Sequence, residues 1–405
     1  MLTAAERLID YTRFETASDE ANPACPSTAS QLEFAAYLEA RLKDLGLEAR
    51  TDSHGYVYSM IPSNLPEKTG KTVGFIAHMD LSSDAPCRST VVQVTENYDG
   101  GTIKRAGGDL SPLDMPELLK YVGKTIVSTD GNTLLGADDK AGIAEIVTLC
   151  EYLAAHPEIP HGDIPIAFTP DEEIGRGADL FDVGAFGADF AYTLDGGALG
   201  EVEFETFNAA AAVIKITGKS IHPGSAKDRM VNAARIACEL EAMLPSETRP
   251  EKTSGYEGFF HLTDMSGCVE EAELKYILRD HDAALLEAKK ALITEICAKL
   301  NEKYGENTVS LTLRDQYRNM AEVVLSYPEI LELARNAVKA VGREPVSCPV
   351  RGGTDGATLS FMGLPCPNLG TGSHGHHGRN EFAVAEEMEL AVLIMAEISS
   401  AAAKL

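Results

Sequence analysis

The sequence is poor in basic residues. Its 405 residues include 35 Lys and Arg against 62 Asp and Glu, which gives a formal net charge of −27 at pH 7. A surface of that sign repels phosphate backbones and anionic lipids, so the composition argues against nucleic acid or a membrane surface as a partner. The apolar fraction of 44% is nevertheless ordinary for a globular protein and too high for a disordered acidic chain.

Cysteine pairs and long apolar runs are also missing. The eight cysteines are scattered and form no C-x-x-C pair, which argues against a disulfide framework or a cysteine zinc site. No window reaches the roughly 18 apolar residues that a membrane span requires. The stretch Met1–Arg7 has no basic segment followed by an apolar one, so we expect a cytoplasmic protein.

Several common catalytic signatures are absent as well. The chain contains no G-x-x-x-x-G-K-[ST], no G-x-G-x-x-G, no G-x-S-x-G and no H-E-x-x-H. Nucleotide binding, a serine nucleophile on a strand-to-helix turn and an H-E-x-x-H zinc protease therefore lose their main support. The segment 130–135 begins like a calcium loop but continues with Thr-Leu-Leu, and we interpret it as a turn.

Strands and helices alternate in the first half of the chain. Short apolar runs bounded by turn residues predict strands over 72–77, 164–169 and 190–194. Apolar residues at helical spacing predict helices over 31–45 and 141–155. This alternation is typical of an α/β domain with a mixed, largely parallel sheet flanked by helices.

The pattern changes after Asn208. Between 208 and 317 the predicted elements follow the order β-α-β-β-α-β, which is the ferredoxin-like motif. The α/β character then resumes. We therefore expect a discontinuous α/β catalytic domain made of residues 1–207 and 318–405, with a small α+β lid or dimerisation-type domain inserted over 208–317.

Carboxylates and histidines gather where strands are predicted to end. The groups are His78 and Asp80; Asp138 and Asp139; Asp171, Glu172 and Glu173; Asp195; and His374, His376 and His377. Each group alone has an ordinary explanation, such as a helix cap, a turn or a solvated acidic loop. Ligands of open α/β sheets, however, bind at the carboxyl ends of the strands, so five such coincidences favour a functional site.

The spacing of the first group suggests metal chemistry. Residues two apart on an extended chain face the same way, so His78 and Asp80 can touch. The histidine could then bind a metal through one ring nitrogen while the aspartate orients it. On its own, a histidine and an aspartate with this spacing at a strand end more often form a simple loop contact.

Longer segments resemble a known family. The similar segments are Pro26–Thr28, His78–Asp80, Thr133–Glu145, His161–Asp163, Ala167–Glu173, Tyr192–Gly197, Ile221–Gly224, Gly255–Gly258, Arg351–Ala357 and Ser360–Asn368. On these motifs the chain resembles the peptidase T family of tripeptide aminopeptidases. That family is similar to other cocatalytic dizinc exopeptidases, including aminoacylases and carboxypeptidase G.

The resemblance implies a metal site. It makes His78 and Asp195 ligands of one zinc ion, Glu173 and His377 ligands of the other, and Asp138 the bridge between them. It implies two zinc ions per subunit, for which cobalt or manganese can substitute. A hydroxide bridging the two ions would attack the scissile carbonyl.

The resemblance also assigns catalytic and substrate-binding roles. Glu172 is the general acid/base, and Asp80 supports the first histidine ligand. His222 corresponds to the histidine that stabilises the oxyanion. Arg279 and Arg351 correspond to positions expected to hold a substrate carboxylate or carbonyl oxygen.

One segment departs from the family pattern. Where the family usually has an aromatic residue before His-Gly, this chain has Ser373, His374, Gly375 and His376 ahead of His377. The spacing to Glu381 favours His377 as the metal ligand. His376 and His374 remain alternatives, and a polar rim is the simpler role for both.

The implied activity is removal of the N-terminal residue from unblocked tripeptides. The alternatives are a dipeptidase, a carboxypeptidase or an N-acyl amino acid deacylase with the same metal site, and a peptide-binding protein without activity. Because His222 lies in the insert, the resemblance also suggests a homodimer in which this histidine serves the partner's site. Closure of the insert over its own chain is the other possibility.

Overall fold

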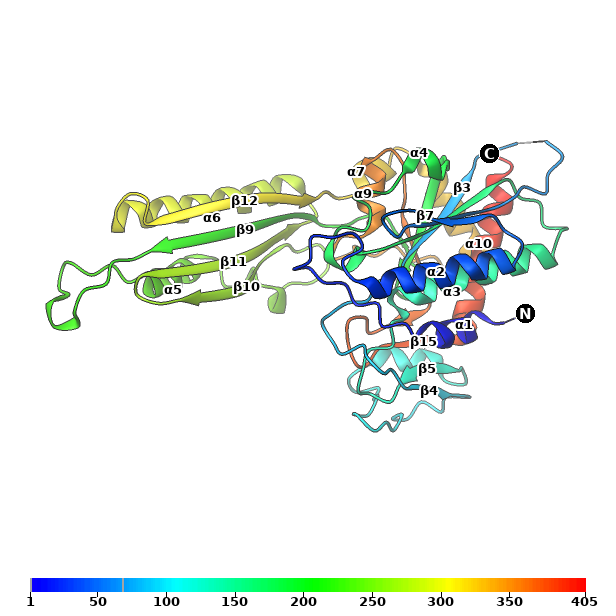
Figure 1. The fold of residues 1–405 in the computed structure, drawn as a ribbon, viewed down its shortest axis with the longest axis horizontal. Coiled ribbons are helices and arrows are strands. Elements are labelled where there is room, and N and C mark those ends of the chain that lie inside the picture. The colour runs from blue at the N-terminus through cyan, green and yellow to red at the C-terminus, as the bar shows by residue number, and fades with distance from the viewer. Residues whose placement is uncertain (1, 68) are drawn as a thin grey trace. The chain divides into compact units, whose positions relative to one another are not determined.

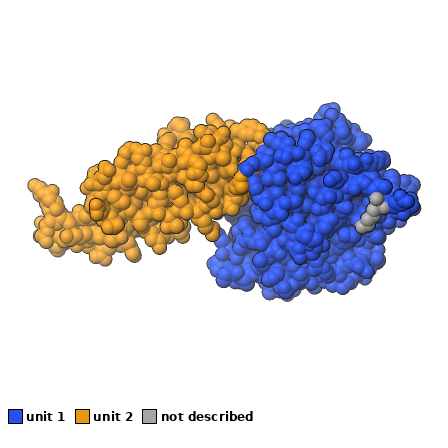
Figure 2. Space-filling view, turned by 90° about the horizontal axis from the view of Figure 1, so that it is seen from above, with its two compact units in different colours: residues 1–204, 320–348, 354–405 blue, residues 205–319, 349–353 orange. Residues whose placement is uncertain are grey.

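The chain folds into two compact units. A computed structural model describes residues 2–67 and 69–405 (Figure 1). Unit 1 is formed by Met1–Phe204, Met320–Cys348 and Thr354–Leu405, and unit 2 by Glu205–Asn319 and Pro349–Gly353 (Figure 2). Unit 2 thus begins at 205 rather than 208 and ends at 319 rather than 317. It also takes in 349–353, which the sequence analysis placed in the α/β domain.

Unit 1 is built on a seven-stranded mixed sheet. Its strand order is β1-β2-β6-β3-β7-β13-β8. The bounds are β1 (Ala49–Thr51), β2 (Val57–Ile61), β3 (Val73–His78), β6 (Ile164–Thr169), β7 (Phe190–Gly196), β8 (Val202–Glu203) and β13 (Asn368–Gly370). The four central strands β6, β3, β7 and β13 are parallel, and the edge strands pair antiparallel. The predicted α/β class is confirmed.

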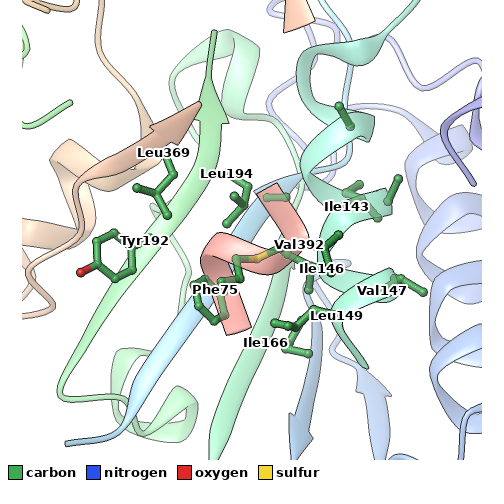
Figure 3. Close-up of a cluster of buried hydrophobic side chains, with 14 of the residues drawn as sticks. Phe75, Ile143, Ile146, Val147, Leu149, Ile166, Tyr192, Leu194, Leu369 and Val392 are labelled. Carbon is green, nitrogen blue, oxygen red and sulfur yellow. The ribbon is translucent and has the colours of Figure 1, made fainter. Parts of the chain in front are cut away.

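Helices flank this sheet. The longer ones are α1 (Ala4–Tyr11), α2 (Ala29–Asp44), α3 (Ala137–Ala155), α8 (Pro328–Ala340) and α10 (Ala385–Ala402). The shorter helices of unit 1 are η1 (Pro116–Tyr121), η2 (Glu172–Ile174), α4 (Val183–Phe186), α7 (Ala321–Val324) and α9 (Asp355–Phe361). Helix α3 is apolar around most of its circumference, which is typical of a fully buried helix. Its Ile143 and Ile146 join Phe75 and Ile166 in the core (Figure 3).

A second, smaller sheet in unit 1 was missed by the sequence analysis. It has four antiparallel strands in the order β14-β15-β5-β4. They are β4 (Val92–Thr95), β5 (Ile126–Thr129), β14 (Ser373–His374) and β15 (Phe382–Val384). Strands of two to four residues are too short for an alternating pattern to reveal them. The sheet matters because it anchors both ends of the loop between His374 and Phe382.

Unit 2 has the predicted ferredoxin-like order. Its elements are β9 (Asn208–Thr217), η3 (Pro223–Ser225), α5 (Ala233–Met243), η4 (Pro250–Lys252), β10 (Phe259–Gly267), β11 (Glu271–Asp280), α6 (Ala283–Tyr304) and β12 (Val309–Tyr317). The antiparallel sheet has the order β10-β11-β9-β12. Alternate β9 residues Ala210, Ala212, Ile214 and Ile216 point into a core shared with the helices.

Two expectations about the chain as a whole can be compared with the structure. Over residues 2–67 and 69–405, no helix combines the length and low charge that crossing a bilayer demands. All eight cysteines lie in that part of the chain, and each is free.

Candidate metal centre

The candidate centre lies at one edge of the central sheet of unit 1. Strands β6, β3 and β7 are adjacent and parallel, so their carboxyl ends meet at this edge. His78 ends β3, Glu172 and Glu173 follow β6, and Asp195 lies near the end of β7. Three polar groups far apart in sequence are thereby brought together.

His78 is held in one orientation by Asp80. The imidazole Nδ1 lies 3.1 Å from the Asp80 backbone carbonyl and 3.3 Å from its carboxylate Oδ1. A carbonyl only accepts hydrogen bonds, so Nδ1 carries the proton. The other nitrogen, Nε2, faces Asp138 Oδ1 at 3.0 Å and Asp195 Oδ1 at 3.5 Å. A nitrogen lone pair that faces two carboxylates is repelled by them unless a proton or a cation lies between the nitrogen and the carboxylate oxygens.

Asp80 also shapes the loop after β6. Its Oδ1 accepts the Glu172 N–H at 2.9 Å, and its Oδ2 accepts the Glu173 N–H at 3.1 Å. Asp80 is fully buried. A single carboxylate therefore fixes both His78 and the backbone of the two glutamates, which extends the supporting role that the resemblance implied.

Asp138 occupies the first turn of α3, where the backbone is not helical. Its φ and ψ are −84° and 102°, and the peptide bond to Asp139 is cis. The two carboxylate oxygens face opposite ways. Oδ1 faces His78, whereas Oδ2 lies 3.4 Å from His377 Nε2 and 3.7 Å from His376 Nδ1. This is the arrangement that a carboxylate bridging two ions requires.

Glu173 and His377 meet on the second side of Asp138. His377 Nε2 lies 2.8 Å from Glu173 Oε2. The imidazole Nδ1 lies 3.0 Å from the Asp84 carboxylate, which orients the ring. The Glu173 side chain is only 5% exposed, and its Oε1 is buried without a hydrogen-bond partner. A buried carboxylate oxygen without a hydrogen-bond donor is suited to binding a cation.

Glu172 lies beside the first side. A ligand atom of Glu172 lies within 4.8 Å of those of His78 and Asp195, and a second such group comprises His78, Asp138 and Glu173. Nitrogen and carboxylate oxygen donors in this number fit divalent zinc. The structure therefore contains two overlapping groups that could hold metal ions, and it places Glu172 close enough to be a ligand itself.

Burial and charge shift the protonation of these groups. Burial and the neighbouring Asp195 charge raise the pKa of Glu172 well above its usual value. Burial raises the pKa of Glu173 to about 7. Burial alone would raise the pKa of Asp138, but His376, His377 and His78 outweigh this effect and hold that pKa well below its usual value. Several carboxylates so close together stay ionised at neutral pH only if positive charge lies among them.

Several supporting residues were missed by the sequence analysis. The Asp171 carboxylate accepts hydrogen bonds from the Ser27 backbone, the Ser27 hydroxyl and the Gln31 amide, and so ties the loop after β6 to α2. The Glu381 carboxylate accepts the backbone N–H groups of Leu135, Gly136 and Asp138. The sequence analysis names Asp171 only as one of three consecutive carboxylates and Glu381 only for its spacing to His377. Their hydrogen bonds depend on how the loops fold, so neither role could be inferred from the sequence.

Asp355 and Asp84 are further additions. Asp355 lines the same small pocket as Glu172 and Asp195, and its Oδ2 is buried without a hydrogen-bond partner. Burial raises its pKa to about 7. Asp355 lies in the segment Arg351–Ala357, which had been noted only for its arginine. Nothing in the sequence around Asp84 indicated that it contacts a histidine almost 300 residues away.

The remaining predicted residues lie in unit 2. His222 is exposed, and its Nδ1 accepts the Gly224 N–H at 3.1 Å. Arg279 is buried, with its guanidinium 5.0 Å from the Tyr317 ring centroid and 2.9 Å from Gln316 Oε1. Arg351, the third predicted residue of unit 2, is described next.

Arg351 is engaged within unit 2. Its Nη1 donates to the carbonyls of Gly255 and Glu257, and its Nη2 donates to the Thr253 hydroxyl. Its guanidinium also lies over the ring of Phe207 at 5.2 Å. In this conformation Arg351 fastens the loop 253–257 rather than presenting a free fork to a ligand.

Known proteins resemble the chain over its whole length. A peptidase T from Caldanaerobacter subterraneus subsp. tengcongensis is 52% identical over 402 residues, covering 98% of both chains. A peptidase T from Clostridium perfringens is 52% identical over 395 residues, covering 97% of both. Residues 204–306, within and just before unit 2, match the peptidase dimerisation domain.

Solved structures share the fold. Aminopeptidase PepT from Bacillus cereus aligns with a TM-score of 0.76 at 23% identity, over 98% of this chain and 99% of that chain. A tripeptidase from Staphylococcus aureus aligns with a TM-score of 0.77 at 20% identity over the whole of both chains. A dinuclear metal-binding peptidase of the M20 family from Bacillus subtilis gives 0.65 at 14% identity, over 98% of both. Given the identity of half its residues to curated relatives over nearly their full length, the chain belongs to the peptidase T family.

Proposed function

We propose that the protein is a metallopeptidase that removes the N-terminal residue from unblocked tripeptides. One observation carries the proposal: two overlapping groups of histidines and carboxylates, joined through Asp138, lie at the carboxyl edge of the central sheet. Full-length similarity to peptidase T relatives supports the substrate class.

The residues present fit two divalent ions, for which we propose zinc. His78 and Asp195 would hold one ion, Glu173 and His377 the other, and Asp138 would bridge them. The orphaned Glu173 Oε1 and the two-sided Asp138 carboxylate support this assignment. When bound, such a pair of ions supplies an activated water and polarises the scissile carbonyl.

Glu172 is the residue we propose to move protons. It would take a proton from the attacking water and deliver it to the leaving amine, the double role that general acid–base catalysis requires. Its raised pKa suits this role, because a carboxyl that holds a proton more tightly than usual can accept one from water and then deliver it to the leaving amine. Asp80 would hold the backbone of Glu172 in place through the hydrogen bond to its N–H.

Substrate recognition is proposed for residues of unit 2. Arg279 and Arg351 would hold a C-terminal carboxylate or a carbonyl oxygen, and a bidentate contact of that kind measures peptide length. Arg351 would first have to release the loop 253–257, to which it donates three hydrogen bonds. Its role therefore depends on movement of that loop.

Dimer formation is the last part of the proposal. The match of residues 204–306 to a peptidase dimerisation domain supports a homodimer. We propose that His222 stabilises the oxyanion in the partner's site, for which its exposed position leaves it available. Mixing inactive His222→Ala and Glu172→Gln subunits would restore activity in this case, and would restore none if His222 serves its own chain.

A peptide panel tests the activity. We expect purified, zinc-loaded protein to cleave the first bond of unblocked tripeptides, and to act far more slowly on dipeptides, tetrapeptides and acetylated tripeptides. Preferential cleavage of dipeptides, of C-terminal residues or of acetylated amino acids would favour the dipeptidase, carboxypeptidase or deacylase alternative respectively. No cleavage by metal-loaded protein would favour a peptide-binding protein.

A further inference from the structure

His376 ends a chain of hydrogen bonds that begins beside Asp195. The Thr371 hydroxyl lies 3.1 Å from the Gly196 carbonyl and 2.7 Å from the Ser373 hydroxyl. Ser373 Oγ in turn lies 2.8 Å from His376 Nε2. Thr371 and Ser373 are almost completely buried, so solvent does not compete for these bonds.

The direction of every bond in this chain is fixed by its first member. The Gly196 carbonyl accepts both the Thr371 backbone N–H and the Thr371 hydroxyl, whose single proton is used in this bond. Thr371 Oγ1 must then accept from Ser373, whose own proton is thereby used. Ser373 Oγ can consequently only accept from the histidine, and His376 carries its proton on Nε2.

The other ring nitrogen of His376, Nδ1, therefore carries no proton and has a free lone pair. Nδ1 lies 3.7 Å from Asp138 Oδ2, which is also an acceptor. Two acceptors that face one another at this distance need a positive group between or beside them. Glu173 Oε1, buried and without a hydrogen-bond partner, adds a further unsatisfied oxygen on the same side of Asp138.

The two other histidines of the cluster are built in the same way. His78 donates Nδ1–H to the Asp80 carbonyl, and His377 has Nδ1 on the Asp84 carboxylate. In each ring the other nitrogen, Nε2, faces a carboxylate oxygen of Asp138. A second acceptor that fixes the ring and its tautomer is the usual companion of a metal-binding histidine.

We propose that His376 is a third histidine ligand of the metal centre, binding through Nδ1 in addition to His377 rather than in its place. Because Nδ1 faces Oδ2 of Asp138, it would serve the ion held by Glu173 and His377. That ion would then have four protein ligands, the number found in closed structural zinc sites. The other ion would have only His78, Asp195 and Asp138. The inference rests on the proposed dizinc function, and it gives the two ions different numbers of protein ligands.

Metal affinity tests the proposal without using activity. The apo-protein would be titrated with Zn²⁺ against a competing chelator, and with Co²⁺ while its visible spectrum is recorded. His376→Phe keeps an aromatic ring but removes both nitrogens, and we expect its tighter site to lose on the order of 10²-fold in Zn²⁺ affinity with a changed Co²⁺ spectrum. Ser373→Ala removes only the acceptor for Nε2–H, and a loss of about 10-fold is expected.

His374→Phe is the matched control. His374 ends β14, two residues before His376, but its Nε2 bonds the Tyr121 hydroxyl at 2.8 Å and its ring stacks on Phe382. We expect its Zn²⁺ affinity and Co²⁺ spectrum to match those of the unmodified protein. Thermal unfolding of each apo-variant, followed by circular dichroism, separates loss of a ligand from loss of the fold.

The outcomes distinguish this inference from the function beneath it. If His376→Phe and Ser373→Ala bind two Co²⁺ ions with unchanged affinity and spectrum, His376 is not a ligand and the inference is overturned, while the dizinc function stands. If His376→Phe does not fold, Ser373→Ala alone decides by the same criterion. If the unmodified protein binds neither metal, the proposed function itself fails.

Discussion

The two units bury very different interiors beneath similar layers of sheet and helix. The core of unit 2 is apolar, with residues such as Ile214, Leu274 and Ile293 filling the space between its sheet and helices. Its buried charged residues Arg279 and Asp280 lie together at the end of β11. Unit 1 has a larger apolar core, but it also buries Asp80, Lys140 and Glu145 completely. Buried charge is costly unless it is paired or hydrogen-bonded, so a fold retains it mainly where chemistry needs it. The contrast agrees with the metal centre that we propose in unit 1.

Polar groups fasten loops in both units, among them Arg351 in unit 2, but the site loops of unit 1 and the long elements of unit 2 are held by different means. In unit 1, the carboxylates of Asp80, Asp171 and Glu381 each accept two or more hydrogen bonds from loop residues or their neighbours. In unit 2, the long elements follow from alternating and helical apolar patterns. The placement of the site loops in unit 1 therefore depends on individual polar groups, whereas the placement of the long elements in unit 2 depends on apolar packing. Substitutions in the two units should have correspondingly different effects.

The largest expected effect is on the rate, from Glu172→Gln. The change keeps the shape but removes the proton acceptor, so tripeptide hydrolysis should fall by about 10²- to 10⁴-fold with metal content near normal. Glu173→Gln is the matched partner and should lower metal content instead. The opposite pattern would mean that Glu172 is the ligand, a role its position beside His78 and Asp195 also allows.

A core substitution in unit 2 should affect stability alone. Leu274 is fully buried, and Leu274→Ala should lower the free energy of unfolding by about 2–5 kcal/mol through lost burial and a residual cavity. Thr312→Ala, at an exposed position of β12, is the control and should change it by less than about 0.5 kcal/mol. Denaturant unfolding measures both. Loss of bound metal from folded Leu274→Ala protein would contradict the separation of roles.

Asp80→Asn should weaken the metal centre with little change in the core. The amide keeps the size of the side chain but loses the charge beside His78 and one of the acceptors for the Glu172 and Glu173 N–H groups. We expect Zn²⁺ affinity to fall by about 10- to 100-fold. Asp99→Asn, in an exposed loop, should leave it unchanged. Equal affinities of the two variants would show that Asp80 does not position the site.

The smallest effect concerns pH. Burial, and then the charge of Glu201, raises the pKa of Glu203 from 4.5 to about 8. Between these values the unfolded chain releases the proton and the folded protein keeps it, so this group favours folding below pH 4.5 and loses that contribution as pH rises through 8. Glu203→Gln should therefore raise the melting temperature at pH 8 but not at pH 4.5. An equal gain at both pH values would rule out titration as the cause.

Much of this contrast could be predicted from the sequence. Strands β3, β6 and β7 followed from short apolar runs. Because ligands of open α/β sheets bind at the carboxyl ends of the strands, the polar residues near these ends could be expected to form one site. The ferredoxin-like order of unit 2 followed from long, regular patterns. Roles for individual ligands came from family resemblance rather than from spacing.

What could not be predicted depends on contacts between distant segments. The link from Asp84 to His377 and that from Glu381 to Leu135 join residues more than 200 positions apart. Neither leaves a periodic pattern that a local window can detect. The same holds for the orientation of His376, which depends on a hydrogen-bond chain from Gly196.

Metal removal and restoration is the measurement that tests the central claim most directly. Metal content and first-bond cleavage of an unblocked tripeptide would be followed together as chelator is added and then as Zn²⁺, Co²⁺ or Mn²⁺ is returned. We expect activity to disappear as the ions leave and to return as about two ions per chain are restored. Full activity in protein shown by elemental analysis to hold no metal would contradict the account.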